Sequence, residues 1–227
     1  MISHQHKCIF IHIPKCAGTS IEKALGHLDN HEGRWGQDHR TMTEIERSIS
    51  KTGKPSLKDH LDKSLRMCGL KKKPKSNPNN RIFVTKGQYD EYFKFTIIRN
   101  PWARFNSLYQ NIMRDELKRK RRSYPADLTL NGFLRHQAKN GLLRAQTHWL
   151  KSMDDSINFD FIGRFETLRQ DFETACAMMG VRNIELPHVL KGTSTSHHAF
   201  YDEESVGIVA DVCKEEIERF GYTFDGG

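Results

Sequence analysis

The chain lacks any long apolar run, and none of its hydrophobic segments approaches the roughly 20 residues that a membrane-spanning helix needs. The first apolar segment begins only a few residues after Met1, which leaves no room for a signal peptide. Its five cysteines are odd in number and form no C-x-x-C pair, so they predict neither a disulfide framework nor a zinc site. We therefore expect a cytoplasmic protein with free thiols, no membrane span and no metal.

Acidic residues are also in short supply, with 28 Asp and Glu against 36 Lys and Arg, which gives a formal net charge of +8. This excess favours anionic ligands but does not separate a nucleotide from a sulfated glycan, a nucleic acid or an acidic membrane. A length of 227 residues suits one domain with a sizeable core that needs neither disulfides nor metals. We expect a single domain over residues 1–227, with a basic insertion at about 51–80.

Residues 8–21, CIFIHIPKCAGTSI, predict a strand that runs into a phosphate-binding turn and then a helix. Pro14 ends the strand, Gly18 permits a tight backbone and close approach of a ligand, and Thr19 or Ser20 can cap the helix. Free N–H groups and the positive end of the helix dipole then meet where Lys15 can also reach. This combination predicts a site for a phosphate or sulfate group.

The turn is not a Walker A loop, in which the lysine follows the second glycine, because Lys15 comes three residues before Gly18. Pro-Lys-x-x-Gly-Thr-Ser instead resembles the loop of sulfotransferases that use 3′-phosphoadenosine 5′-phosphosulfate (PAPS) as sulfuryl donor. The resemblance implies that the 5′-phosphosulfate is held by Lys15, Cys16, Ala17, Gly18, Thr19 and Ser20.

A second informative stretch has an apolar strand from Phe93 to Ile98, Arg99 at its carboxyl end, and Pro101 in the first turn of a helix. Arg99 and Ser107 can both face the crevice where open α/β sheets bind ligands. A guanidinium and a hydroxyl suit a phosphate monoester. Arg-Asn-Pro-x-x-Arg-x-x-Ser resembles the sulfotransferase motif for the 3′-phosphate, which implies that role for Arg99 and Ser107.

Two later segments, FIGRFETLRQDF and the stretch from Tyr201 to Phe224, extend the resemblance over most of the chain. They are similar to carbohydrate-type sulfotransferases related to heparan sulfate 2-O- and chondroitin sulfotransferases, especially compact bacterial members. The similarity lapses in the basic insertion and around the run Lys118–Arg122. A hydroxyl-rich loop can also close over the nucleotide, with an ordinary surface loop as the equal alternative; its residues are Lys191, Gly192, Thr193 and Ser194.

Alternation of strands and helices predicts an α/β domain whose central, mainly parallel sheet is flanked by helices. The resemblance implies that this is the P-loop-like fold of sulfotransferases. The strands at Ile9, Phe95 and Phe161 are expected in one sheet. We expect helices at residues 128–138, 142–150 and 203–220, and Gln146, His148 and Trp149 as candidate residues of an acceptor cleft.

The resemblance implies sulfuryl transfer from PAPS to a hydroxyl, without a metal. By analogy with phosphoryl transfer, Lys15 is then expected to neutralise charge at the leaving oxygen. The acceptor needs a general base, for which we select His39, in a segment similar to one in bacterial relatives. Glu44, His60 and His12 stay open as alternatives.

Two other classes of function stay open, a P-loop-type nucleotide-dependent kinase and a basic nucleic-acid-binding module. The missing Walker lysine argues against the first, and the position of the basic runs outside the strand–loop–helix units argues against the second. We therefore expect an enzyme whose partner is not nucleic acid but a carbohydrate or other hydroxyl-bearing acceptor, and an anionic acceptor stays open. The sequence does not identify that acceptor.

Overall fold

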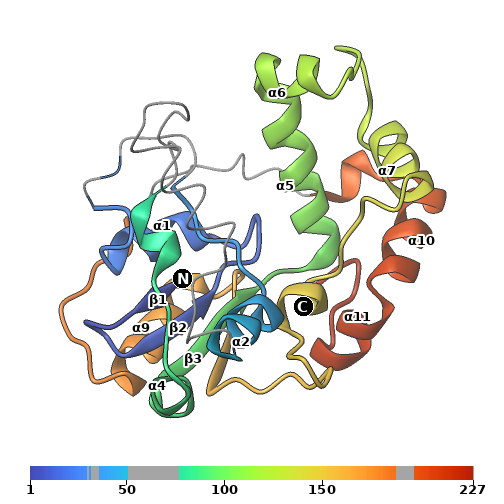
Figure 1. Ribbon diagram of the computed structural model, residues 1–227. Helices are drawn as coiled ribbons and strands as arrows, with labels where there is room; N and C mark the ends of the chain where they lie inside the picture. The colour runs from blue at the N-terminus through green and yellow to red at the C-terminus, as the bar shows by residue number, and fades with distance from the viewer. Residues whose placement is uncertain (30, 32–35, 51–76, 188–196, 227) are drawn as a thin grey trace.

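The computed structural model describes the whole chain except residues 30, 32–35, 51–76, 188–196 and 227 (Figure 1). The helix expected within residues 57–68, the lysine cluster at 71–75 and the loop at 191–194 lie outside the described residues. In the described part, no helix combines the length and the apolar character needed to cross a membrane.

Four strands of the described residues form one sheet in the order β1-β2-β3-β4. Their bounds are β1 Ile2–Ser3, β2 Cys8–Ile11, β3 Phe93–Ile98 and β4 Phe161–Arg164. β1 runs antiparallel to β2, whereas β2, β3 and β4 are parallel, with Phe10 opposite Phe95 and Phe95 opposite Phe161. The prediction of a mainly parallel sheet that contains all three expected strands is confirmed.

Burial explains why the strand segments are almost continuously apolar. All four residues of β2 are buried, as are the last four of β3. The one hydroxyl among them, on Thr96, donates to the Ile11 carbonyl at 2.9 Å, so this polar group is paired inside the sheet. Strands of this kind, covered on both faces, place their ligand-binding residues at the carboxyl edge of the sheet.

The helices form two groups, each with its own hydrophobic core. The group at the sheet consists of α1 Gly18–Ala24, α2 Met42–Ser50, α4 Lys86–Glu91 and α9 Leu168–Met178, with the short 3₁₀ helix η1 Pro78–Arg81. The other group stands to the right of the sheet in Figure 1 and consists of α5 Pro101–Arg114, α6 Glu116–Arg121, α7 Leu130–Lys139 and α10 Glu203–Val212, with η2 His197–Phe200. Between the groups lie α8 Thr147–Leu150 and α11 Lys214–Phe220, of which Ile217 contacts both cores.

Two expected helices differ from the structure. Residues 142–146 are not helical, because their backbone groups bond to other elements: Arg104 donates to the Arg144 carbonyl, and the Gln146 N–H donates to Glu216. The C-terminal helix is divided at Cys213 into α10 and α11. The division leaves Glu216 fully buried and facing Gln146.

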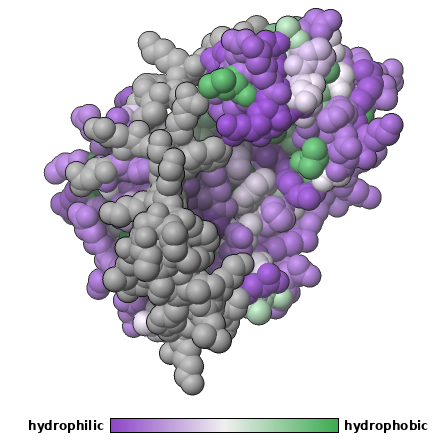
Figure 2. All heavy atoms as spheres, turned by 45° about the horizontal axis from the view of Figure 1, so that its top comes forward, coloured by the Kyte–Doolittle hydropathy of each residue, from purple (hydrophilic) through white to green (hydrophobic). Residues whose placement is uncertain are grey.

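The outer surface is mainly hydrophilic where Figure 2 shows the described residues. Large exposed hydrophobic side chains belong to different elements, such as Leu117 on α6 and Met178 on α9. Scattered residues of this kind are normal for a globular protein.

Candidate functional site

The turn after β2 has backbone angles that aim N–H groups outward. Lys15 and Ala17 have positive φ values of 76° and 60°, and α1 begins at Gly18 with Ala17 as its N-cap. Among the described residues, no hydrogen bond uses the N–H groups of Gly18 and Thr19. Alternation of right- and left-handed backbone next to a helix N-terminus makes a concave site for an anion.

Two details of this turn correct our expectation. Thr19 and Ser20 do not cap α1, since both lie inside its first turn and the N-cap makes no side-chain hydrogen bond. Gly18 is not the residue with unusual backbone angles; it is small because a Cβ there would lie 2.0 Å from the ring of His12. The glycine therefore makes room for a histidine.

Cys16 faces inward from the same turn. Its side chain is 1% exposed, and its thiol lies 3.3 Å from Oε1 of Gln146. Burial raises the pKa of the Cys16 thiol to about 12. Only the backbone of this residue can therefore meet a ligand above the turn.

Arg99, at the carboxyl end of β3, reaches the turn directly. Its Nη1 donates to the Lys15 carbonyl at 3.1 Å, and its guanidinium lies over the Phe165 ring at 4.0 Å. Its Nε is buried and has no hydrogen-bond partner among the described residues. The two sequence motifs thus form one site, and a buried donor is left for a ligand.

Ser107 lies two turns into α5, whose first turn is fixed by Pro101 and by the Asn100 side chain, which accepts the Ala103 N–H at 3.2 Å. The Ser107 hydroxyl has no hydrogen-bond partner among the described residues. It is half-buried, so its hydroxyl remains accessible to a ligand.

Gln146 connects the parts of the site through buried hydrogen bonds. It accepts the Arg99 N–H at 2.8 Å, donates to the Arg99 carbonyl at 2.8 Å, and also contacts Cys16 and Glu216. Because Gln146 is 0% exposed, its expected place in an acceptor cleft is wrong. His148 is exposed, and Trp149 packs partly against the core.

Positive charge is concentrated around Lys15. Partial burial and then the charges of Arg99, Lys118 and Arg114 lower the pKa of Lys15 to about 8. Arg114 ends α5 and Lys118 lies in α6, so part of the basic helix end acts on the turn. A cation held among cations is stabilised when an anion binds beside it.

His39 lies on the other side of the turn, just before α2. Its Nδ1 lies 3.2 Å from the His12 carbonyl oxygen, and the two imidazole rings are 4.2 Å apart. If Nδ1–H donates to that carbonyl, Nε2 carries the lone pair. Desolvation, and then His12, lower the pKa of His39, although the residue is exposed and water screens part of this effect.

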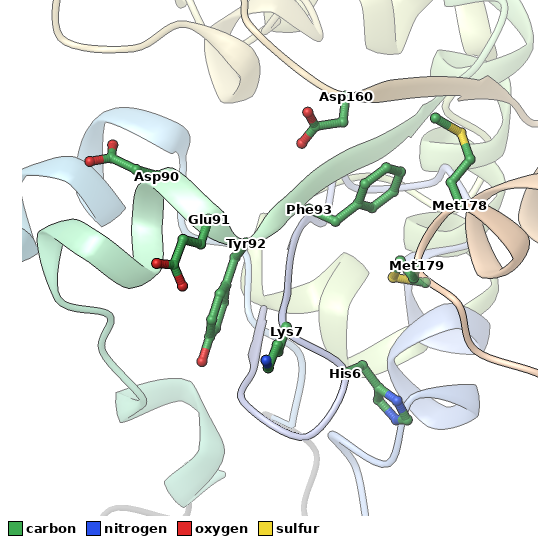
Figure 3. Close-up of a pocket in the computed structure, with 9 residues that line it drawn as sticks. All are labelled: His6, Lys7, Asp90, Glu91, Tyr92, Phe93, Asp160, Met178 and Met179. Atoms are coloured by element: carbon green, nitrogen blue, oxygen red, sulfur yellow. The ribbon is translucent and has the colours of Figure 1, made fainter.

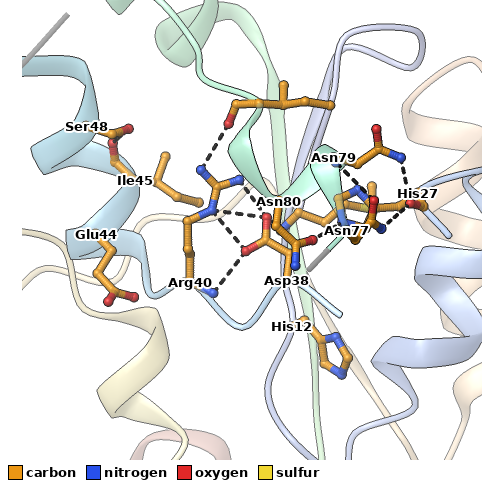
Figure 4. Close-up of polar contacts among 12 residues, drawn as sticks. His12, His27, Asp38, Arg40, Glu44, Ile45, Ser48, Asn77, Asn79 and Asn80 are labelled. Atoms are coloured by element: carbon orange, nitrogen blue, oxygen red, sulfur yellow. Dashed lines mark hydrogen bonds and ion pairs between the residues drawn. The ribbon is translucent and has the colours of Figure 1, made fainter. Parts of the chain in front are cut away.

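The residues on both sides of His39 are firmly held (Figure 4). Arg40 forms an ion pair with buried Asp38 at 2.6 Å and donates to the Ile82 carbonyl at 3.0 Å. Nearby, Asn77 is 1% exposed and donates to the carbonyls of His27 and Gly36. The end of the basic stretch therefore packs against the segment that carries His39.

The alternative bases are placed differently. Glu44 caps α2, since it accepts the Thr41 N–H at 2.8 Å, while Thr41 accepts the Glu44 N–H. His12 is 3% exposed, and its pKa is lowered to about 3, chiefly by burial. His60 and the loop residues Lys191, Gly192, Thr193 and Ser194 lie outside the described residues.

An open pocket with a volume of about 300 Å³ lies elsewhere, at the amino ends of β2 and β3 (Figure 3). Lys7, Asp90, Glu91 and Asp160 are among its lining residues. Because β2 and β3 are parallel, this pocket is at the opposite edge of the sheet from Lys15 and Arg99. It is not part of the candidate site.

The family model described as "Sulfotransferase family" matches residues 1–223 of the chain. The comparisons with curated proteins and with solved structures give no match.

Proposed function

The chain belongs to the sulfotransferase family and is thus a sulfuryl-transferring enzyme; from this premise we propose that its donor is PAPS and its acceptor a carbohydrate hydroxyl. PAPS is the family's usual donor. The observation that carries the proposal is the hydrogen bond from Arg99 Nη1 to the Lys15 carbonyl, which joins the two motifs.

In this proposal the two phosphate groups of the donor bind to different parts of the site. The turn from Lys15 to Ser20 receives the 5′-phosphosulfate, with free N–H groups at Gly18 and Thr19 and the ammonium of Lys15. Arg99 and Ser107 receive the 3′-phosphate. The unpartnered Nε of Arg99 and the free hydroxyl of Ser107 fit this role, because buried donors need an acceptor.

The proposed transfer is in line. The acceptor hydroxyl loses its proton to Nε2 of His39 as its oxygen attacks sulfur, and the bond from sulfur to the bridging phosphate oxygen breaks. The electron pair of that bond stays with adenosine 3′,5′-bisphosphate, whose new charge is stabilised by Lys15. An exposed imidazole with a lowered pKa suits the base, since it is neutral at pH 7 and accessible.

Three considerations favour a carbohydrate acceptor, and an anionic one in particular. The sequence resembles carbohydrate-type enzymes, the net charge is +8, and the charges of Arg114 and Lys118 act on Lys15. These cations would attract a sulfated or carboxylated sugar chain to the transferring end of the donor.

Transfer of labelled sulfate from PAPS to a panel of acceptors tests the proposal. The panel would contain desulfated and sulfated polysaccharides, small phenols and a tyrosine peptide. We expect label in a polysaccharide fraction and competition by adenosine 3′,5′-bisphosphate but not by ATP. Labelling of phenols or peptides alone would contradict the acceptor, and binding of ATP in preference to the bisphosphate would contradict the donor.

A further inference from the structure

Glu22 is an acid that the proposed mechanism does not use, although it is completely buried next to the site. It lies in α1, four residues after Gly18, and its side chain is 0% exposed. Its Oε1 accepts the Asp38 N–H at 3.0 Å, while its Oε2 has no hydrogen-bond partner among the described residues. A buried carboxyl that is only half satisfied requires a reason for its presence.

The imidazole ring of His12 lies beside the Glu22 carboxylate. The His12 Nδ1 lies 3.0 Å from Glu22 Oε1, without the alignment of a hydrogen bond. Gly18 touches the other edge of this ring, because a Cβ at residue 18 would overlap it. His12 therefore has little freedom to move away from Glu22.

The same ring is packed against His39. The two ring centres are 4.2 Å apart, and His39 Nδ1 meets the His12 carbonyl. A chain of contacts thus leads from buried Glu22 through His12 to exposed His39. A second link runs through Asp38, the residue directly before His39. The Asp38 N–H donates a hydrogen bond to Glu22.

We propose that Glu22 is a positioning residue for His39: its carboxylate holds His12 and Asp38 in place, and its charge supports the protonated form of His39 during turnover. The inference rests on the proposed role of His39 as base. A negative charge behind an imidazole stabilises the imidazolium that forms when the acceptor proton arrives.

The ionisation of Glu22 makes this role dependent on pH. Burial raises the pKa of Glu22 to about 7, opposed by the Met1 ammonium, the Asp38 N–H and His27, while the charge of Asp38 raises it further. Glu22 and Asp38 both raise the pKa of His39, and His12 lowers it. The Glu22 carboxylate is therefore expected to stabilise protonated His39 above pH 7 and not well below pH 7, where Glu22 is itself protonated.

Nuclear magnetic resonance of the full chain, labelled in histidine and loaded with adenosine 3′,5′-bisphosphate, tests the contact itself. The ε1 signal of His39, identified by its loss in His39→Gln, should show a step with a midpoint near pH 7. Glu22→Gln should abolish this step, because it removes the charge and keeps the acceptor for the Asp38 N–H. Glu91→Gln, which changes an exposed acid at the other end of the sheet, should leave the step intact.

A wild-type signal without this step, or a step that persists in Glu22→Gln, overturns the proposal. If Glu22→Gln does not fold, Glu22→Asp moves the carboxylate back by one methylene and should shift the midpoint. An unchanged midpoint in that variant also overturns the proposal. None of these results depends on turnover, so they are distinct from a failure of the proposed function.

Kinetics on an acceptor from the labelling panel separate support of the base from a purely structural role. At pH 6, where Glu22 is protonated, the kcat of Glu22→Gln should equal that of the wild type. At pH 8 it should be lower by roughly threefold to tenfold, with the KM for PAPS unchanged. An equal loss at both pH values would indicate a structural role alone and contradict the proposal.

Discussion

At the scale of single residues, the account depends on how the surroundings of Lys15 and His39 set their protonation. Lys15 is half-buried among other cations, so its ammonium is less stable than that of a surface lysine. His39 is exposed but adjoins a neutral histidine. The Lys15 ammonium is expected to lose its proton at moderately alkaline pH, and the His39 imidazole is expected to be neutral at neutral pH.

The affinity for adenosine 3′,5′-bisphosphate should therefore fall as pH rises above about 8, the pKa of Lys15. At pH 9 only about a tenth of the free enzyme carries the ammonium, so the Kd should be weaker by roughly tenfold. In Lys15→Arg the side chain stays charged, and this pH dependence should disappear. Calorimetry between pH 7 and 9 measures it, and a Lys15→Arg curve parallel to that of the wild type would count against the assignment.

The matched control is Lys23→Arg, an exposed position in α1, the helix that follows the turn. It should keep the pH dependence of the wild type.

His39→Ala should reduce kcat by roughly a hundredfold or more and leave the affinity for the bisphosphate nearly unchanged. The reason is that the imidazole acts on the acceptor and not on the donor. In the wild type, kcat should fall at acidic pH as His39 becomes protonated, and this fall should be absent from the residual activity of the variant. Near-normal turnover in His39→Ala at saturating substrates would contradict the role of His39 as base. Glu44 and His60 would then be the next candidates.

Gly18→Ala should destabilise the fold by about 1–3 kcal/mol, because its Cβ would have to displace the buried ring of His12. Gly207→Ala is the control: it lies in α10, and its Cβ would meet nothing within 4 Å. There we expect a gain of roughly 0.5–1 kcal/mol from the better helix former. Urea denaturation measures both, and equal effects at the two positions would show that His12 is not packed as described.

At the scale of the elements, the site is assembled from segment ends that meet through buried polar contacts. Gln146 precedes α8 and contacts the end of β3, the turn after β2 and α11. One side chain thus joins three places in the fold, and all of its partners are buried or half-buried. The geometry of Arg99 therefore depends on a residue distant in sequence.

Gln146→Leu should lower the free energy of unfolding by about 2–4 kcal/mol, because it leaves the backbone N–H and carbonyl of Arg99 without partners and removes one of the donors to the carboxylate of Glu216. It should also weaken binding of the bisphosphate through the displacement of Arg99. His148→Leu is the control, since His148 is exposed two residues away, and it should change stability by less than about 0.5 kcal/mol. A Gln146→Leu protein as stable as the control would contradict this view of the network.

The sequence predicted the elements that depend on local patterns. Apolar runs located β2 and β3, and Pro101 marked the first turn of α5. The non-helical segment 142–146 could not be predicted, because it depends on contacts with Arg104 and Glu216, 40 and 70 residues away. Glu22 was missed for the same reason: an acid in a short helix looks solvent-exposed until the fold places Asp38 and His12 beside it.

At the scale of the whole molecule, the parallel sheet explains why two motifs 84 residues apart form one site, since Arg99 and Lys15 follow neighbouring strands. Two helix groups meet beside this edge, and the second brings the cations of α5 and α6 toward Lys15. The family and the α/β fold are shown. The single domain with a basic insertion, the acceptor, the cytoplasmic location and the loop at residues 191–194 stay predictions.

The central claim is that Arg99 recognises the 3′-phosphate of the donor above the turn that holds its 5′-end. Calorimetry with two ligands tests it most directly: adenosine 3′,5′-bisphosphate and adenosine 5′-phosphate, which lacks the 3′-phosphate. Arg99→Ala should weaken binding of the bisphosphate by about tenfold to a hundredfold and leave that of the monophosphate nearly unchanged. Arg182→Ala, an exposed arginine after α9, should affect neither. Equal losses for both ligands in Arg99→Ala, or no loss for either, would contradict the account.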